Sequence, residues 1–575
     1  MRRSFSALSE QSFDLLVIGG GAFGACAAWD ATLRGLKVAL VERTDFASGT
    51  SANSFKMVHG GIRYVQHLDI PRLRASCRER SALLRVAPHL VSPLPIVIPT
   101  YGHLRQGKAF LGTGMLLYDL LTADRNRSIR DQTRHIPPRR FLGRAEIQNL
   151  FPGIEADDLT GGAVFCDGQM YNPTRLVLAF VRSAVELGMV AANYAEAEEL
   201  LRSADSIVGA RVRDLETGEF TDVRARAVLN AAGPWVPWML DQRQQLPLKQ
   251  AGTYSRDACF LVQRQFPHSY ALAVQGRTQD PDAVLSRAAR HLFIVPWREF
   301  SLVGVWHVVW QEHPDSVSVT EAELTSFLGE INEAFPGMEL TSDDVTMWNA
   351  GLVPFGENEP GAKHLSYGKR SHIIDHKREH GIDNLVSLIG VRYTMARGDA
   401  AKAVDMLCRK LEKRVPGCTT DRTPIFGGDF ESFSELCSDV ARCAPPGTPD
   451  RAFEPLAHNY GTQYRDIFAL GGEDPELAQT VDESTTLRGE VIHAIRAEMA
   501  VHLSDIVFRR TDLGTGGHPG SVALRQVAQL AARELGWSDQ TMLTELDDVE
   551  RRFGVGVTLE PLSIARREPE LEELA

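Results

Sequence analysis

The most constraining feature of the chain lies within its first 42 residues. An apolar run at residues 14–18 leads into Gly19, Gly21 and Gly24, and a second apolar run ends at Glu42. A strand, a tight glycine turn, a helix and a second strand ending in an acid form the βαβ unit that binds a dinucleotide. Gly19 then permits the turn, Gly21 lets the backbone approach a pyrophosphate, and Gly24 lets the helix pack on the strand. Glu42 is expected to accept hydrogen bonds from a ribose.

The fingerprint alone leaves NAD and FAD equally open, because both bind to this unit. The next residues run to the segment HGGIRY (59–64), and this stretch resembles the FAD-dependent glycerol-3-phosphate dehydrogenase family, within the D-amino-acid-oxidase-like flavoenzymes. Further segments follow in the family's order: RGLKVALVE (34–42), ERSALLRVAPHLV (79–91), LLYDLL (116–121), NAAGPW (230–235), LIGVRYTMAR (388–397), HNYGTQYRDI (458–467) and EMAVHLSDIVFRRT (498–511). The resemblance implies FAD as the cofactor.

The resemblance also implies an architecture. We expect an α/β protein with a two-dinucleotide-type FAD-binding Rossmann fold, an antiparallel-sheet cap domain for the substrate, and a C-terminal α-helical domain. The FAD-binding domain is predicted at 12–425, with the cap interleaved mainly at about 65–165 and 245–355, and the helical domain at 426–575. A chain of 575 residues exceeds a single core, which agrees with several domains.

Local patterns add detail to this architecture. Prolines between residues 65 and 170 are expected to divide that segment into short elements. Asn172-Pro173 is expected to begin a helix, and alternating segments at 250–350 favour an antiparallel sheet that would roof the flavin. Apolar residues spaced by three and four predict one helical stripe that is core: Val491, Ile495, Met499, Leu503 and Ile506.

The motif positions imply which residues bind FAD. Ser51, Ser54 and Lys56 are expected to donate hydrogen bonds to the pyrophosphate or isoalloxazine region, and the turn at Ala232-Gly233 to pass close to FAD. The full predicted set is Gly19, Gly21, Phe23, Gly24, Glu42, Arg43, Ser51, Ser54, Lys56, His59, Gly60, Gly61, Gly233, Gly390 and Thr394.

The reaction implied by the resemblance is oxidation of sn-glycerol 3-phosphate to dihydroxyacetone phosphate. Hydride passes to flavin N5, and the electrons pass on to quinone. Arginine suits the phosphate of such a substrate because its planar fork matches phosphate oxygens. The predicted catalytic set is Arg63, Tyr64, Arg370, Arg392 and His59. His59 is expected to contact the flavin, and whether it also acts as a base is left open.

Two departures from the family pattern concern the substrate. Val353 stands where better-known members have an arginine, and the segment ending at Cys259 replaces their Lys-Gly-Ser-His. Arg256 and Arg392 are candidates to compensate. The alternative function is therefore an FAD-dependent oxidase or dehydrogenase of another small phosphorylated or carboxylated alcohol or amino acid. A flavin-containing binding protein without turnover is the third reading.

Composition bounds the partners. The formal net charge of −12 argues against nucleic acid, and eight cysteines without metal-ligand spacing predict no metal site. No secretory signal is recognised, which favours the cytoplasm. The apolar segment 109–121, followed by seven arginines up to Arg144, fits either a core helix or peripheral attachment to the inner face of the cell membrane. The resemblance favours attachment, with quinone as a partner, and leaves a homodimer open.

Overall fold

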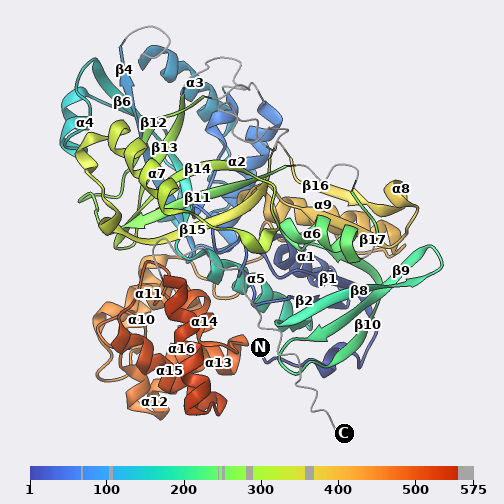
Figure 1. Cartoon of the computed structure of the whole chain (residues 1–575). Helices are drawn as coiled ribbons and strands as arrows, with labels where there is room; N and C mark the ends of the chain where they lie inside the picture. Colours follow the sequence, from blue (N-terminus) through green and yellow to red (C-terminus); the bar gives the residue numbers. More distant parts are fainter. Residues whose placement is uncertain are drawn as a thin grey trace.

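The computed structural model describes residues 1–65, 69–102, 108–243, 245–248, 253–279, 289–355, 368 and 370–553. Within these ranges the chain forms two large sheets with packed helices, and a group of helices near its C-terminal end (Figure 1). The mixed sheets and the helical C-terminal part confirm the predicted α/β class.

The first sheet is the predicted nucleotide-binding sheet. Its strand order is β16-β17-β10-β1-β2-β7, and β8 and β9 extend it from β10 as an antiparallel ribbon. The pairs β17-β10, β10-β1, β1-β2 and β2-β7 are parallel. The strands are β1 (Phe13–Ile18), β2 (Val38–Val41), β7 (Val190–Ala192), β8 (Ala195–Ser203), β9 (Ser206–Asp214), β10 (Phe220–Asn230), β16 (His372–Asp375) and β17 (Leu385–Ile389).

Both faces of this sheet are buried. Along β1, Leu15 and Val17 point into one apolar cluster, whereas Leu16 and Ile18 point into another on the opposite face. A strand covered on both faces reads as a continuous apolar run, which is why 14–18 could be recognised in the sequence. The first cluster includes residues of α1 (Ala22–Leu33), α5 (Pro173–Glu186) and α9 (Ala396–Lys410). Two further helices in this part of the chain are short: α6 (Val236–Trp238) and α8 (His376–His380).

The second sheet is largely antiparallel, as predicted for the cap. Its order is β15-β11-β14-β13-β12-β4-β6-β3, with β5 paired to β6. The strands are β3 (Met57–Val58), β4 (Val91–Tyr101), β5 (Arg140–Leu142), β6 (Leu159–Met170), β11 (Tyr254–Val262), β12 (Ala271–Gln279), β13 (Ala289–Trp297), β14 (Phe300–Trp310) and β15 (Val345–Pro354). The helices of this part are α2 (Ile70–Val86), α3 (Lys108–Leu121), α4 (Arg144–Leu150) and α7 (Glu321–Ala334).

The expectation that prolines divide residues 65–170 into short elements is wrong at β4, although Pro88, Pro137, Pro138 and Pro152 do lie between elements. Pro93, Pro95 and Pro99 all lie within the eleven-residue strand β4. Because they are separated by even numbers of residues, their missing N–H groups fall on one edge of the strand. β4 pairs with β6 along its whole length but with β12 only at Ile96 and Val97, so the prolines cost few ladder bonds.

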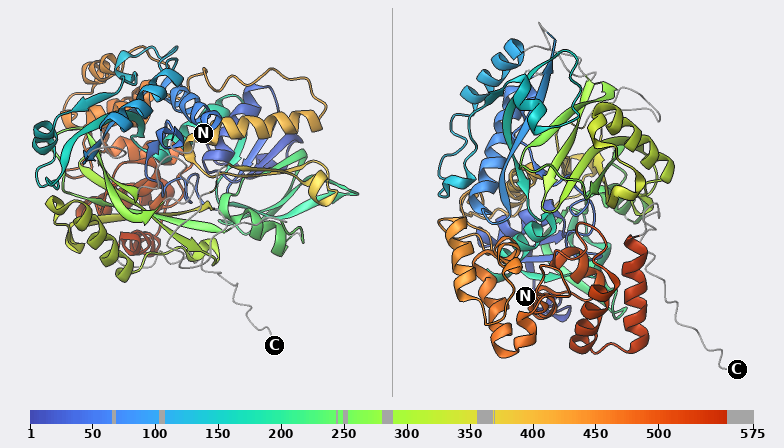
Figure 2. Two further views of the ribbon diagram at one scale, coloured as in Figure 1. Left: turned by 90° about the horizontal axis from the view of Figure 1, so that it is seen from above. Right: turned by 90° about the vertical axis from the view of Figure 1, so that its left-hand side faces the viewer.

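The C-terminal helices form a third layer beside both sheets (Figure 2). They are α10 (Phe433–Cys443), α11 (Phe453–Tyr460), α12 (Tyr464–Glu473), α13 (Arg488–Glu498), α14 (Leu503–Asp505), α15 (Ser521–Leu535) and α16 (Asp539–Phe553). The predicted boundary at 425/426 stays a prediction. The predicted single apolar stripe is wrong, because Met499 ends α13 in the left-handed conformation at φ +56° and joins the core of the first sheet.

Buried ion pairs attach these helices to the first sheet. Asp45, which is fully buried, accepts hydrogen bonds from Arg509 and Arg510 at 2.6–2.7 Å. On α5, Arg175 and Arg182 reach the buried Glu498 at 2.6 and 3.0 Å. The loop that follows Glu42 is therefore held directly by the C-terminal helices.

Candidate active site

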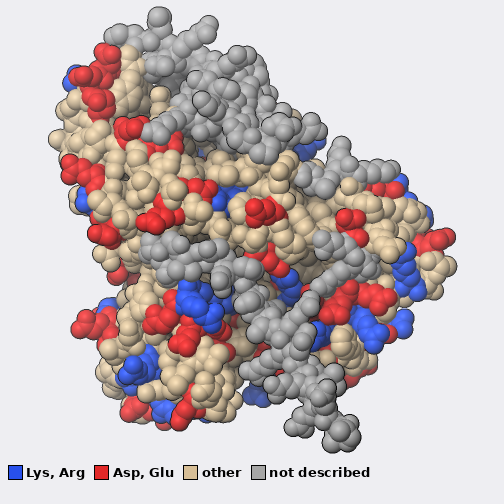
Figure 3. Space-filling view, in the orientation of Figure 1, with Lys and Arg blue, Asp and Glu red and all other residues tan. Residues whose placement is uncertain are grey.

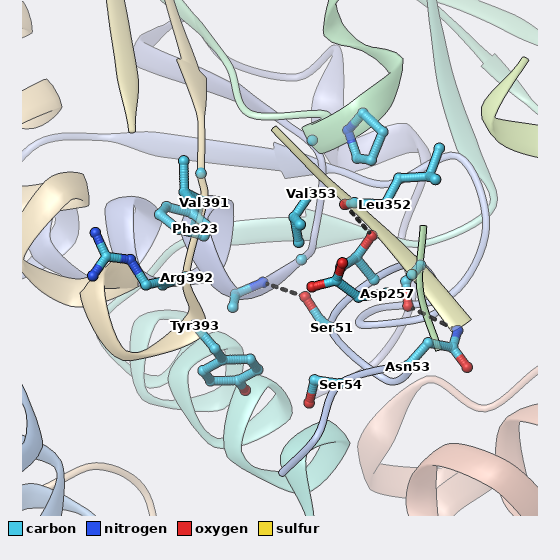
Figure 4. Close-up of a pocket in the computed structure, with 18 of the residues that line it drawn as sticks. Phe23, Ser51, Asn53, Ser54, Asp257, Leu352, Val353, Val391, Arg392 and Tyr393 are labelled. Carbon is cyan, nitrogen blue, oxygen red and sulfur yellow. Dashed lines mark hydrogen bonds between the residues drawn. The ribbon is translucent and has the colours of Figure 1, made fainter. Parts of the chain in front are cut away.

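A cavity of about 850 Å³ lies between the two sheets. Its floor is formed by turns at the carboxyl ends of β1, β2, β10 and β17, which are adjacent strands of the parallel sheet. This edge is where open α/β sheets bind ligands. Residues of β11, β14 and β15 form the opposite wall. Figure 4 shows Phe23 and Arg392 on one side of the pocket and Leu352, Val353 and Asp257 on the other.

The glycine turn fits a nucleotide cradle. Gly19 has φ +104°, and a Cβ there would lie 2.6 Å from the Ala231 carbonyl oxygen. A Cβ on Gly24 would lie 1.9 Å from the Gly19 carbonyl oxygen, so only glycine lets α1 pack against the turn. Gly21 lines the cavity at the start of α1 and has no side chain with which to cap the helix, although the Ser51 hydroxyl accepts the Ala22 N–H. The rest of the first turn of α1 can receive a phosphate.

The acid after β2 closes the same end of the cavity. Glu42 accepts hydrogen bonds from the N–H groups of Gly20 (2.6 Å) and Thr44 (2.9 Å), and burial raises its pKa. Arg43 also lines the cavity, but its guanidinium pairs with Asp315 at 2.8 Å and lies 5.3 Å from the Trp235 ring centroid. The ion pair links the nucleotide-binding sheet to the loop that follows β14.

The serine-rich loop at 51–56 supports the cradle. The Ser51 hydroxyl accepts the Ala22 N–H at 2.9 Å, and Ser54 accepts the Lys56 N–H at 3.4 Å. Lys56 is 3% exposed, its ammonium lies 4.8 Å from the Trp297 ring centroid, and no described residue hydrogen-bonds to that ammonium. Burial lowers the pKa of Lys56 to about 8. All three residues line the cavity, but the Lys56 ammonium itself is buried.

Hydrogen bonds from its backbone N–H groups hold the HGG segment (59–61) in place. The His59 N–H donates to the Thr394 hydroxyl at 2.9 Å, and the Gly60 N–H donates to Asp167 at 2.6 Å. His59, Gly61 and Thr394 line the cavity. Gly60 does not line it, because a Cβ at this position would point instead toward the buried Arg80, 2.1 Å away.

Not all predicted cofactor residues therefore face the cavity. Gly24 and Gly60 shape it through close packing, whereas Gly233, Gly390 and Phe23 line it. Gly233 has φ +57°, and a Cβ on Gly390 would lie 2.0 Å from the Phe23 ring. Gly390 therefore lets the turn after β17 approach α1 closely, whereas the position of Gly233 is open.

Substitution of Gly390 tests this packing. We expect Gly390→Val to displace the Phe23 ring and lower the FAD content of the purified protein at least about tenfold, since a misfit of about 1.4 kcal/mol already costs that factor. FAD absorption per chain measures the effect. Gly417→Val is the matched control for a folded protein, because this exposed glycine has no positive φ and no atom lies within 4 Å of a Cβ there. An unchanged FAD content in Gly390→Val would contradict the assignment.

Two arginines lie near Tyr64 at the other end of the cavity. The guanidinium carbons of Arg72 and Arg392 lie 4.2 and 5.1 Å from the ring centroid, and all three residues line the cavity. Burial lowers the pKa of Arg392 to about 10, which leaves it charged at neutral pH. Arg72 was not anticipated from the sequence. The only signal was its position on the first turn of α2, shortly after HGGIRY.

Two other predicted arginines have different outcomes. Arg63 lies in a short helical turn, Ile62–Val65, and its side chain is outside the described part of the structure. Arg370 is exposed and is not among the described residues that line the cavity, so its catalytic contact stays a prediction. It lies just before β16, an edge strand of the first sheet.

The departures at Val353 and Cys259 both fall in the cavity wall. Arg256 does not replace the missing cation, because successive residues of β11 point to opposite faces of the sheet. Its buried guanidinium pairs with Glu323 at 2.6 Å, whereas Asp257 and Cys259 face the cavity. Asp257 in turn meets His307 of β14 at 2.7 Å. The sequence did not single out either of these two residues.

No metal centre accompanies this site in the part of the chain that the structure describes, where no group of three or more His, Cys, Asp or Glu side chains is arranged around a common point.

Together the fold and the cavity define a flavoprotein oxidoreductase. The model of the FAD dependent oxidoreductase family matches residues 14–390, and that of the C-terminal domain of alpha-glycerophosphate oxidase matches residues 418–542. The chain is 32% identical to the glycerol-3-phosphate dehydrogenase of Synechocystis sp. over 552 residues, which cover 94% of this chain and 96% of that protein. It is 31% identical to the glycerol-3-phosphate dehydrogenase of Mycobacterium leprae, over 97% of this chain and 90% of that protein.

A solved structure supports the fold. The glycerol-3-phosphate dehydrogenase from Bacillus halodurans complexed with FAD has a TM-score of 0.72 and 24% identity, over 97% of each chain. The chain belongs to the FAD-dependent glycerol-3-phosphate dehydrogenase family, and its cofactor is FAD. The glycine cradle and the position of the start of α1 at the cavity fit this cofactor.

Proposed function

We propose that the protein oxidises sn-glycerol 3-phosphate to dihydroxyacetone phosphate and delivers the electrons to a quinone. FAD supplies the two-electron acceptor for such an oxidation, through hydride transfer to its N5 atom. The observation that carries the proposal is the pair of guanidiniums, Arg72 and Arg392, that lie near the Tyr64 ring in the cavity. Two cations suit a phosphate dianion, and arginine can bind its oxygens bidentately.

The charge distribution of the cavity supports one orientation of the substrate. The wall formed by β11 and β15 carries Val353 and the carboxylate of Asp257, neither of which attracts a phosphate. The wall at Tyr64 carries the arginines. The phosphate is therefore placed at Arg72 and Arg392, with the carbinol end toward Asp257.

A second candidate function is oxidation of another small anionic alcohol or amino acid. Val353 and Asp257 favour it, because a carboxylate on the cavity wall can accept hydrogen bonds from extra hydroxyl or amino groups. Glycerol 3-phosphate and a panel of phosphorylated or carboxylated alcohols and amino acids are compared as substrates, with a water-soluble quinone or oxygen as acceptor. Dihydroxyacetone phosphate formed with quinone and little peroxide supports the first proposal. Faster turnover of another substrate, or rapid peroxide formation, favours the second.

Quinone lies in membranes, and α3 offers a surface for attachment. Leu116, Leu117 and Leu120 of this helix are 46%, 40% and 69% exposed; we name them the leucine face. Of the described helices, none combines the length and apolar content needed to span a bilayer. An amphipathic helix with such a face can instead lie in the headgroup region. We propose that the protein is held there on the inner face of the cell membrane.

The arginines after α3 contribute less than the sequence suggested. Arg134 is buried against the Phe433 ring, and Arg125 and Arg139 pair with Asp119 of α3 itself. Arg127 and Arg144 are exposed. On the coloured part of the surface in Figure 3, acidic and basic side chains are interspersed. Attachment would therefore depend chiefly on the leucines.

Substitution of the leucine face tests attachment. We expect Leu116→Glu with Leu120→Glu to reduce co-sedimentation with vesicles of mixed neutral and anionic lipid at least about tenfold, because two charges replace apolar area that would be buried. Flavin absorption should be unchanged. Leu543→Glu on α16, where the leucine is 51% exposed, is the matched control and should bind vesicles normally. Equal sedimentation of the double variant and wild type would rule out this surface.

A further inference from the structure

Asp257 and His307 form a hydrogen-bonded pair on the cavity wall opposite the glycine cradle. They are directly paired residues of β11 and β14, and Asp257 Oδ1 lies 2.7 Å from His307 Nδ1. The Ser255 hydroxyl donates to the same Oδ1 at 2.6 Å, which fixes the carboxylate. The side chains of Asp257 and His307 are 27% and 20% exposed, and both line the cavity.

This arrangement selects one form of the imidazole. A carboxylate accepts a hydrogen bond from Nδ1–H, so the neutral ring carries its proton on Nδ1. Nε2 is then the atom that can accept a proton, and the neighbouring carboxylate stabilises the imidazolium that results. A histidine oriented in this way is suited to general base catalysis.

We propose that His307 accepts the hydroxyl proton of the substrate and that Asp257 is the positioning residue for its ring. This inference rests on the proposed function, in which an alcohol is oxidised to a ketone. The O–H bond breaks and its proton goes to His307 Nε2; the C–H bond breaks and its hydrogen leaves with both electrons to FAD. A C=O bond forms, so the substrate loses two electrons and FAD gains them.

His59 is the competing base, and its geometry is less favourable. Its Nδ1 lies 3.7 Å from Asp167 Oδ2, beyond hydrogen-bond distance. Asp167 is already engaged by Arg80 at 2.7 Å and by the Gly60 N–H at 2.6 Å. The His59 ring is thus held less firmly than the His307 ring.

The proposed orientation of the substrate agrees with this assignment. A phosphate at Arg72 and Arg392 leaves the carbinol end toward the wall of β11 and β14, where His307 lies. Other titratable residues that line the cavity on this side are Cys259 of β11, His291 of β13, Glu330 of α7, His313 and Asp315, whereas β15 contributes none. A pH dependence of the flavin reduction rate must therefore be assigned to His307 by substitution, because its midpoint alone does not identify the titrating residue.

The test compares wild type with His307→Gln, His59→Gln and Asp257→Asn, all loaded with FAD. Rates of anaerobic flavin reduction by glycerol 3-phosphate are measured by stopped flow across pH 5.5–9. Flavin reduction in His307→Gln is expected to be about 10²- to 10⁴-fold slower than in wild type. Its rate should also no longer rise with pH as a basic group loses its proton. Its affinity for dihydroxyacetone phosphate, followed by the shift in flavin absorption, should change less than about threefold. In Asp257→Asn flavin reduction should be slower, and the rise of its rate with pH should move to lower pH, because a charge that stabilises the imidazolium is lost.

A second readout needs no turnover. In the ¹⁵N spectrum of [¹⁵N]histidine-labelled holoenzyme, the neutral His307 ring should carry its proton on Nδ1, and Asp257→Asn should disturb that tautomer. His372→Gln, a substitution of an exposed histidine, is the matched control and should reduce flavin normally. A neutral ring protonated on Nε2, or a His307→Gln rate equal to wild type, would overturn the inference. If glycerol 3-phosphate does not reduce the flavin of wild type, the proposed function fails instead. The tautomer of His307 alone then tests whether Asp257 positions its ring.

Discussion

Replacing Arg392 with alanine is expected to lower kcat/KM for glycerol 3-phosphate by about 10- to 150-fold. The guanidinium lies at the Tyr64 end of the cavity, where it would donate charge-assisted hydrogen bonds to the phosphate. Losing such bonds costs about 1.5–3 kcal/mol, which corresponds to this range. Steady-state kinetics with a soluble quinone measures the change.

The control variants separate charge from geometry. Arg392→Lys keeps the positive charge but loses the planar fork, so its kcat/KM should lie between those of wild type and the alanine variant. Arg409→Ala removes an exposed arginine at the end of α9 and should leave the kinetics unchanged. If Arg392→Ala retained the wild-type kcat/KM, the phosphate would have to bind elsewhere.

Replacing Asp45 with asparagine is expected to lower the free energy of unfolding by about 3–5 kcal/mol, the usual cost of removing one partner from a buried ion pair. Asp45 is fully buried and receives hydrogen bonds from Arg509, Arg510 and the amide of Asn193. The substitution leaves the buried Arg510 guanidinium without its counter-charge, whereas Arg509 keeps its ion pair with Asp505. Denaturant unfolding of the holoprotein measures it.

Limited proteolysis should show where the effect arises. In Asp45→Asn, cleavage should begin between the first sheet and the C-terminal helices, because Arg509 and Arg510 belong to the helical part. Asp548→Asn, which removes an exposed carboxylate paired with Arg551, should leave the unfolding midpoint in place. A stable Asp45→Asn protein with an unchanged cleavage pattern would show that this ion pair does not hold the helices.

Local sequence signals predicted the glycine turn and the acid after β2, which the structure places at the cavity. The turn at Gly19–Gly24 and the acid at Glu42 occupy one continuous segment whose steric needs are strict, so each residue type is diagnostic. The pair of Asp257 and His307 is fifty residues apart and meets only through the register of β11 and β14. Such a pair cannot be found without the strand pairing.

Two errors have similar causes. Arg256 was a reasonable candidate cation from its position, but the side-chain alternation of β11 turns it away from the cavity. The stripe from Val491 to Ile506 follows helical spacing, yet the left-handed Met499 breaks the helix within it. Periodicity reports which residues are buried more reliably than it reports an unbroken element.

Anaerobic addition of glycerol 3-phosphate to the purified, FAD-loaded protein tests the central claim most directly. The oxidised flavin absorbs near about 450 nm, and this band should bleach as the substrate is oxidised, with formation of an equal amount of dihydroxyacetone phosphate. Arg392→Ala should bleach more slowly at the same substrate concentration. A flavin that stays oxidised with glycerol 3-phosphate, while dithionite bleaches it fully, would contradict the proposed substrate.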